Sequence, residues 1–328
     1  MKIAYADLKA TFKRVLLDLS FEENKAELCA GIFADNSRDG VYSHGINRFP
    51  VFVAYVKKGW INIHAEPALA ERNGLIECWD GHLGPGMYNA TVAMNRAIEQ
   101  AQENGIGCVA LKNTNHWMRG GTYGWQAAKA GCIGICFTNT IPNMPPWGGI
   151  EPRLGNNPLV ISVPFENGQH IVLDMAMSQY SYGKLQENSL QQKELSVPGG
   201  FDEEGKLTTV PSAIIKTQRA LPVGFWKGSG LSLILDVLLT AVTGGQSVKR
   251  ISEREAETGL SQFFLCLHQN DYHEQLVKEI IAYTKSASPT DPNESILYPG
   301  ERTLAIRMKN EAEGIPVNQK MWEAILAL

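Results

Sequence analysis

The sequence has no marked excess of charge of either sign. Its 328 residues include 30 lysines and arginines and 34 aspartates and glutamates. A surface so nearly balanced argues against a protein that binds nucleic acids or membrane surfaces in general. The sequence therefore predicts no nucleic-acid partner, and any anion-binding site must be local.

Signals for export, disulfides and membrane insertion are also missing. Residues 1–7 contain no apolar block before a small-residue cleavage site, and no uncharged apolar run approaches the length of a membrane span. The six cysteines lie mostly in apolar runs, and none forms a Cys-x-x-Cys pair. We therefore expect a cytoplasmic protein with reduced cysteines and no membrane partner.

The common nucleotide-binding motifs are absent as well. Residues 105–110 have the letters of a dinucleotide fingerprint, but they follow an expected helix and run into an expected strand, the reverse of strand–turn–helix order. Lys227 is preceded by Trp226 where a Walker loop has glycine. Lys227 and its neighbouring glycines could still hold an anion at a helix start. The sequence predicts neither a Rossmann fold nor a P-loop.

Apolar periodicity divides the chain near residue 68. Before this point it predicts a helix over 6–19, a second helix after a capping-box pattern of Ser20 and Glu23, and a third over about 47–58. Beyond it, short β-like runs begin, and Asn73-Gly74 predicts a hairpin. Strands are expected over 68–72, 75–79, 107–112, 133–140, 157–163, 170–175 and 262–268.

Two later segments predict different environments. Residues 193–223 are polar and interrupted by proline, which indicates a long surface excursion. Residues 231–242 are nearly all apolar, which predicts a central and fully buried helix.

Residues 41–50 concentrate side chains that suit catalysis. His44 can give and take a proton near neutral pH, and Arg48 offers a rigid fork of donors that suits a carboxylate. In the plainer alternative Ser43 caps a helix, and His44 and Arg48 lie on the surface, because such pairs are common. Other parts of the chain must decide between the two.

Two further segments offer partners. His116 lies in a polar, glycine-rich loop between a strand and a helix, where sites are commonly built, but it could equally be bonded to loop backbone. Asp174 ends an apolar strand, and a carboxylate is costly to bury alone. Its partner could be His44, Arg48 or a backbone amide of the following helix.

Five motifs, in their order along the chain, resemble the malate/L-lactate dehydrogenase family, whose members lack a Rossmann fold. They are Ser-His-Gly at 43–45 with Arg48, Asn115-His116, Thr138-Asn139 before a proline-rich loop, Asp174-Met175, and Lys-Gly-Ser-Gly at 227–230. The likeness spans nearly the whole chain, and this order is more specific than any single motif. Residues 41–50, 115–121 and 144–148 are most similar to bacterial reductases of 2-oxo sugar acids.

The resemblance implies a fold and an assembly. It implies an α/β, non-Rossmann nicotinamide-binding domain over residues 71–245, with a mixed, largely antiparallel sheet flanked by helices. A helical domain would be formed by both chain ends, residues 1–70 with 246–328. The protein would be a homodimer, with its active site between the domains and near the dimer interface.

The resemblance also implies a reaction, the NADH-dependent reduction of a 2-oxo sugar acid by hydride transfer. NADP is the alternative cofactor, and malate, L-lactate or another 2-hydroxy acid the alternative substrate. The cofactor would lie against His170, Ile171, Val172, Leu173, Asp174, Met175 and Ala176, against Trp226 and Lys227, and against Gly300, Glu301 and Arg302.

Chemistry then assigns roles within the site. Reduction of a 2-oxo acid needs a proton for the developing alkoxide and a fixed carboxylate. We expect His44 to donate the proton, Arg48 to hold the carboxylate, and Asp174 or Ser43 to orient the imidazole. His116, Thr138 and Asn139 would form the substrate wall.

Two other classes of protein compete with a reductase. One is a hydrolase with Ser43 as nucleophile, or a metal site built from His44, His116 and Asp174. The Gly-x-Ser-x-Gly elbow and the helical spacing of metal-binding histidines are both missing, so we expect no metal. The other is a non-catalytic sugar-acid-binding protein that uses Arg48 and Lys227.

Overall fold

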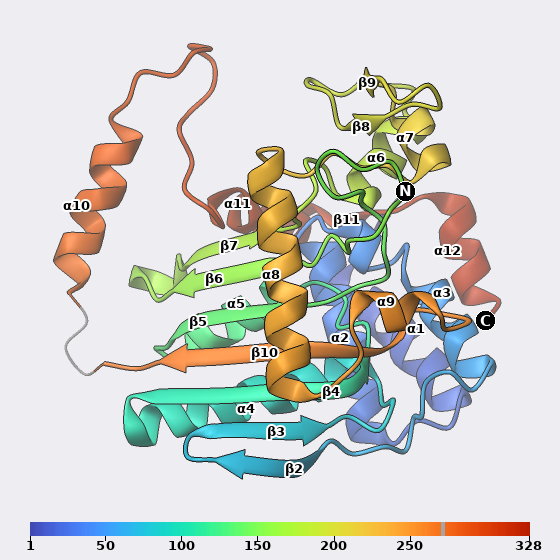
Figure 1. The fold of residues 1–328 in the computed structure, drawn as a ribbon, viewed down its shortest axis with the longest axis vertical. Helices are drawn as coiled ribbons and strands as arrows, with labels where there is room; N and C mark the ends of the chain where they lie inside the picture. Colours follow the sequence, from blue (N-terminus) through green and yellow to red (C-terminus); the bar gives the residue numbers. More distant parts are fainter. Residues whose placement is uncertain (270–272) are drawn as a thin grey trace.

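A seven-stranded mixed sheet forms the centre of the computed structural model, which describes residues 1–269 and 273–328 (Figure 1). Only β3 and β4 are parallel neighbours; the other pairs are antiparallel. In spatial order the strands are β2 (Ala68–Asn73), β3 (Ile76–Asp80), β4 (Ile106–Asn115), β10 (Thr258–Leu267), β5 (Ile133–Thr138), β6 (Leu159–Val163) and β7 (Ile171–Met175). The predicted mixed, largely antiparallel α/β fold is confirmed.

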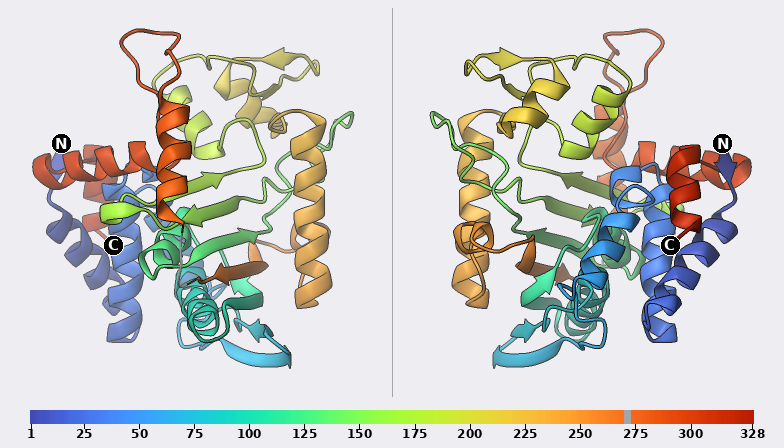
Figure 2. Two further views of the ribbon diagram at one scale, coloured as in Figure 1. Left: turned by 90° about the vertical axis from the view of Figure 1, so that its left-hand side faces the viewer. Right: turned by 90° about the vertical axis from the view of Figure 1, so that its right-hand side faces the viewer.

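Helices cover the two faces of the sheet unequally. Helices α4 (Gly86–Asn104) and α5 (Gly121–Lys129) pack on one face, whereas α8 (Trp226–Thr243) lies on the other (Figure 2). Short helix α9 (Val248–Ser252) connects α8 to β10. The face that carries α4 and α5 also receives the N-terminal helices, so both chain ends lie on that side.

The chain ends are joined in one helical layer. It contains α1 (Tyr5–Asp18), α2 (Glu23–Arg38), the 3-10 turn η1 (Tyr42–His44), α3 (Phe49–Lys57), α11 (Glu301–Glu313) and α12 (Gln319–Leu326). Strand β1 (Lys2–Ile3) pairs with β11 (Ile315–Pro316), and Trp322 packs in the same core as Phe12 and Phe33. The division into two domains stays a prediction. Strand β10 belongs by sequence to the expected helical domain, residues 1–70 with 246–328, but it lies at the middle of the sheet.

Some local predictions hold and others do not. Asn73 pairs with Ile76 across the predicted hairpin turn. Residue Gly105 ends α4 in a left-handed conformation, so the fingerprint letters mark a helix end. The capping box is wrong: Ser20 has a φ of 68°, and no side chain caps α2. The third helix begins only at Phe49, because η1 precedes it.

Residues 193–223 are not a bare surface loop. They contain α7 (Pro211–Thr217) and a small hairpin of β8 (Gly200–Phe201) and β9 (Leu207–Thr208). With α6 (Tyr182–Leu190) they enclose a separate apolar cluster of Leu185, Leu195, Ile214 and Ala220. This lobe stands at one end of the sheet, beside the β6–β7 edge (Figure 1).

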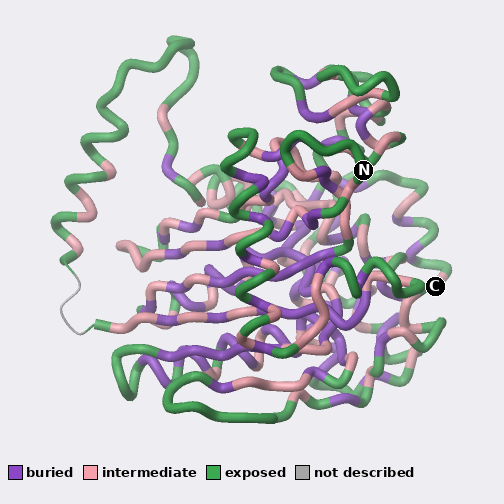
Figure 3. The backbone as a smooth tube through the Cα atoms, in the orientation of Figure 1, coloured by how far each residue is buried: buried purple, intermediate pink, exposed green. Residues whose placement is uncertain are grey.

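Helix α8 is not fully buried as predicted. Exposure is 51% for Leu233, 51% for Ile234 and 52% for Val237, and the tube along α8 alternates between exposed and buried residues (Figure 3). By length and composition α8 could cross a membrane, but core helices of soluble proteins meet the same criteria. Helix α10 (Glu274–Lys285) lies at the edge of the molecule in Figure 1, where Lys278 pairs with Glu166 and Lys285 with Glu301. The turn η2 (Glu166–Gly168) lies between β6 and β7.

Candidate active site

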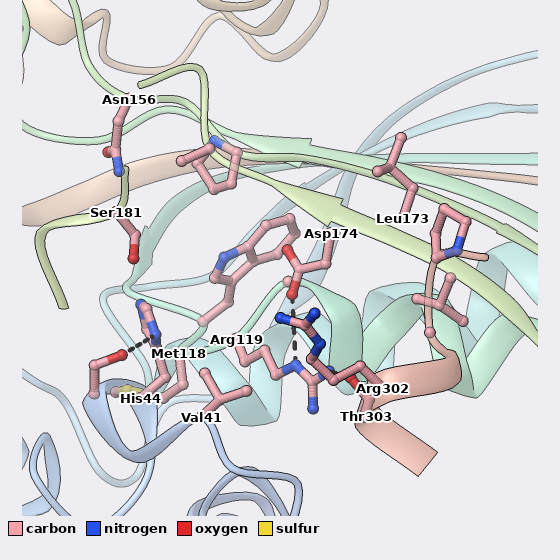
Figure 4. Close-up of a pocket in the computed structure, with 18 of the residues that line it drawn as sticks. Val41, His44, Met118, Arg119, Asn156, Leu173, Asp174, Ser181, Arg302 and Thr303 are labelled. Atoms are coloured by element: carbon pink, nitrogen blue, oxygen red, sulfur yellow. Dashed lines mark hydrogen bonds and ion pairs between the residues drawn. The ribbon is translucent and has the colours of Figure 1, made fainter. Parts of the chain in front are cut away.

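Two adjoining cavities lie where strand ends, η1 and the start of α11 meet, and Figure 4 shows residues that line the larger one. The larger, of about 600 Å³, is lined by Asp174, Arg119 and Arg302 among others. The smaller, of about 240 Å³, contains Arg48 and Glu257. Ser43, His44, His116, Thr140, Asn156 and Ser181 line both cavities. The structure therefore brings the two predicted histidines to the junction of two compartments.

The backbone around His44 is fixed by the end of α2. Asn36 donates from Nδ2 to the carbonyl of His44 at 3.0 Å. The Ser37 hydroxyl accepts from the amide of Ile46 at 2.8 Å. A Cβ at Gly45 would lie 2.3 Å from Ser37 Oγ, so only glycine permits this close approach. The histidine thus projects from a turn that is anchored on both sides.

The imidazole of His44 is half-buried and neutral at pH 7. Burial lowers its pKa to about 4, and although Asp174 opposes this shift, the guanidiniums of Arg48 and Arg119 reinforce it. Ser43 Oγ lies 3.2 Å from Nδ1, and the ring stacks on His116 at a centroid distance of 5.7 Å. A neighbouring negative charge, such as a developing alkoxide, favours protonation of this ring.

His116 fits both interpretations of its loop. Its Nδ1 accepts a hydrogen bond from the amide of Met118 at 3.0 Å, which is the predicted backbone alternative. It also lines both cavities beside His44. Burial, with the nearby charge of Arg48, lowers its pKa well below the usual value. His116 is therefore a neutral wall of the junction.

Asp174 has partners that the sequence did not suggest. Its Oδ2 accepts from the amide of Gly121, at the start of α5, at 2.9 Å and lies 3.5 Å from Nε of Arg119 (Figure 4). Arg119 is buried and also donates to Asp39 at 2.9 Å, which binds Arg307 as well. The sequence signal that could have indicated Arg119 as a site residue is its position before two glycines in the loop after β4.

Arg48 is paired within the smaller cavity. Its Nη2 lies 3.3 Å from Oε2 of Glu257, a residue that the sequence analysis missed. Glu257 precedes β10, and Thr258 pairs with Asn115 of β4, so the register places the carboxylate beside His116. Glu257 belongs to no local motif, because only strand pairing brings it to the site.

The predicted cofactor residues divide into two groups. Val172, Leu173, Asp174, Ala176, Gly300 and Arg302 line the larger cavity. The others do not line it. His170 accepts from the amide of Phe165, Glu301 pairs with Lys285, and Ile171 and Met175 are half-buried at the two ends of β7. Trp226 and Lys227 begin α8 on the opposite face of the sheet.

The lining of the larger cavity fits a dinucleotide phosphate. Gly300 precedes α11 with a φ of 103°, and its Cβ position lies 3.0 Å from the carbonyl of His170, so the helix start fits tightly against β7. Free amides at a helix N-terminus attract anions. Arg302 adds a cation that forms no ion pair with any other described residue. The donors present therefore suit the phosphates of a dinucleotide.

Of the three residues predicted to form the substrate wall, His116 lines both cavities, whereas Thr138 and Asn139 line neither. Thr138 donates to the carbonyl of Ser261, and Asn139 donates to Asp236, so both are tied into the core. Thr140 lines both cavities instead. Within residues 1–269 and 273–328, no group of three or more His, Cys, Asp and Glu is arranged to hold a metal ion.

The non-Rossmann α/β sheet, with two histidines in a cavity that reaches a helix start suited to an anion, fits a dehydrogenase. Residues 3–326 match the malate/L-lactate dehydrogenase family model, and the chain belongs to that family. It is an oxidoreductase that acts on CH–OH groups, as its relatives are.

Relatives with known names refine this class. The chain is 46% identical to the 2,3-diketo-L-gulonate reductase of Pasteurella multocida and 43% identical to that of Escherichia coli O127:H6, with all of each chain covered. Among solved structures, it is similar to sulfolactate dehydrogenase from Methanocaldococcus jannaschii, at 29% identity and a TM-score of 0.89, covering 100% and 98% of the two chains. Malate dehydrogenase from Pyrococcus horikoshii gives 28%, a TM-score of 0.88, and coverage of 99% and 93%.

Proposed function

We propose that the protein reduces 2,3-diketo-L-gulonate to 3-dehydro-L-gulonate with NADH. The observation that carries the proposal is the meeting of His44 and Arg48 in one cavity that continues to the start of α11. The names of the full-length relatives support this substrate over malate or L-lactate.

Each side chain has a separate task in the reduction. When bound, the cofactor supplies a hydride to the C2 carbonyl carbon. Arg48 holds the substrate carboxylate through its planar fork. His44, neutral at rest, passes a proton from solvent to the C2 oxygen as negative charge develops there, and the resulting CH–OH group carries both added hydrogens. Asp174 favours the protonated ring electrostatically, and Ser43 fixes its orientation at Nδ1.

The proposal is tested by NADH oxidation in the presence of purified protein. Substrates are 2,3-diketo-L-gulonate, pyruvate, oxaloacetate and a cyclic imino acid, each with NADH and with NADPH. We expect the highest kcat/KM for 2,3-diketo-L-gulonate with NADH. Faster reduction of pyruvate or oxaloacetate would favour the lactate or malate alternative. No oxidation with any substrate would favour a sugar-acid-binding protein.

A variant pair tests the proton donor. His44→Ala should lower kcat by about two to four orders of magnitude, the usual contribution of a positioned acid or base. His64→Ala removes an exposed imidazole and should leave kcat unchanged. Near wild-type turnover in His44→Ala would remove His44 from the mechanism.

We also propose that the protein is a homodimer that buries the outer face of α8. This face presents Leu233, Ile234, Val237 and Leu238 to solvent, and a contiguous apolar surface commonly marks an interface. A cofactor role for Lys227 would then require the cavity of the partner copy, because Lys227 lines neither of the two cavities at the site in its own chain. Light scattering of the wild type should give twice the mass of one chain, and the Val237→Glu variant should give the mass of a single chain. A monomeric wild type would contradict the dimer.

A further inference from the structure

The smaller cavity contains one cationic and one anionic side chain, Arg48 and Glu257. Both histidines in its lining have lowered pKa values, so they are neutral at pH 7. The remaining polar side chains of the lining are neutral: Ser43, Thr140, Asn143, Asn156, Ser181, Tyr182, Gln186 and Gln218. A substrate that binds here therefore meets a single cation within a field of neutral hydrogen-bonding groups.

The carboxylate of Glu257 is fixed inside this cavity. Its Oε1 accepts from the amide of Ile141 at 3.2 Å, and its Oε2 is 3.3 Å from Nη2 of Arg48. The side chain is only 13% exposed. Because it is bonded on both oxygens and packed at the end of β10, it cannot easily turn away from a bound ligand.

Such an arrangement treats monocarboxylates and dicarboxylates differently. One substrate carboxylate can bind Arg48 beside Glu257. A second carboxylate in the same cavity finds no further cation and faces the charge of Glu257. At a separation of about 6 Å and an effective dielectric constant of about 20, this repulsion corresponds to roughly a 100-fold loss of binding. A hydroxyl in that position can instead donate to the carboxylate.

We propose that Glu257 is a specificity-determining residue, which selects 2-oxo acids with one carboxylate and a hydroxylated chain over 2-oxo dicarboxylates. The inference rests on the proposed function, because it concerns the substrate of the same site. The charge of Glu257, rather than the size of the cavity, would then select the substrate class.

The decisive experiment compares kcat/KM for 2,3-diketo-L-gulonate and oxaloacetate in the wild type and in Glu257→Gln. The ratio of oxaloacetate to 2,3-diketo-L-gulonate should rise about 100-fold in the variant, because the repulsion is removed. Glu257→Asp keeps the charge and should keep the ratio within a few fold. Glu255→Gln removes an exposed carboxylate two residues away and should change nothing.

Each outcome separates this inference from the proposed function. An equal fall for both substrates in Glu257→Gln would show that Glu257 only positions Arg48, and would overturn the inference while the reductase stands. A wild type that reduces no 2-oxo acid would overturn the proposed function itself.

A measurement on the wild type alone covers the case in which Glu257→Gln does not fold. L-Gulonate and L-malate are compared as competitive inhibitors against 2,3-diketo-L-gulonate. L-Gulonate, with one carboxylate, should bind about 100 times more tightly. Equal inhibition constants would overturn the inference.

Discussion

A methyl group added at Gly183 should impair catalysis by moving Ser43. Gly183 lies in the first turn of α6, and a Cβ there would lie 2.4 Å from Ser43 Cβ and 2.5 Å from its Oγ. Ordinary contact begins at 3.4 Å, so the two must separate by about 1 Å. Ser43 Oγ lies 3.2 Å from Nδ1 of His44, so its displacement reorients the imidazole. A misplacement of this size costs roughly 100-fold in rate.

The assay is steady-state NADH oxidation with Gly183→Ala. We expect kcat to fall roughly 100-fold while α6 is not weakened, because alanine has a higher helix propensity than glycine by about 1 kcal/mol. Thermal unfolding measures whether the fold is retained. The Gly183→Ala change is then repeated in a Ser43→Gly background, where the Cβ that clashes is absent, and it should have little further effect on kcat.

Two results would refute this reasoning. Wild-type kcat in Gly183→Ala would show that α6 moves away without disturbing Ser43. A full loss on adding Gly183→Ala to Ser43→Gly would show that the effect does not pass through Ser43, since independent sites give additive changes.

Three further predictions follow from the charged groups. Arg48→Lys should raise KM for the 2-oxo acid more than it lowers kcat, because an ammonium cannot reproduce the two-pronged contact, and an unchanged KM would make Arg48 structural. Because the folded pKa of His44 is below the unfolded value, the unfolded state binds more protons between about pH 6.5 and 4, and stability falls as pH falls through this window. In urea unfolding, the free energy of unfolding should fall by up to about 3 kcal/mol less between pH 7 and pH 4 in His44→Gln than in the wild type. An equal fall in both proteins would contradict this. Arg119→Met should destabilise the fold by about 3 kcal/mol, because it removes a cation from the buried Asp39 and from Asp174 at the cavity wall, and a loss below about 1 kcal/mol would contradict this role.

Features set by neighbouring residues could be predicted from the sequence. The hairpin at Asn73-Gly74 depends on two residues that favour its turn, and the structure forms it. The end of α4 at Gly105 needs only glycine's left-handed conformation. Residues 41–50 were selected because their side-chain chemistry is unusual, and His44 does line the cavities.

Features that depend on contacts between distant parts of the chain could not be predicted from the sequence. Glu257 reaches the site only through the register of β10 on β4, and Arg119, in the loop after β4, reaches Asp174 on β7. The apolar composition of α8 predicted burial, but composition does not tell whether the protein's own core or another surface covers a helix face. Thr138 and Asn139 line neither cavity, because their side chains bond to Ser261 and Asp236, which are distant in the sequence.

The late position of β10 in the sequence constrains how this protein is made. Its strand fills the gap between β4 and β5, which are translated more than a hundred residues earlier. Until the ribosome has released residue 267, both of those strands keep an open edge that can pair with other chains. A nascent or truncated chain should therefore depend on chaperones and aggregate readily, whereas the finished chain closes its own sheet.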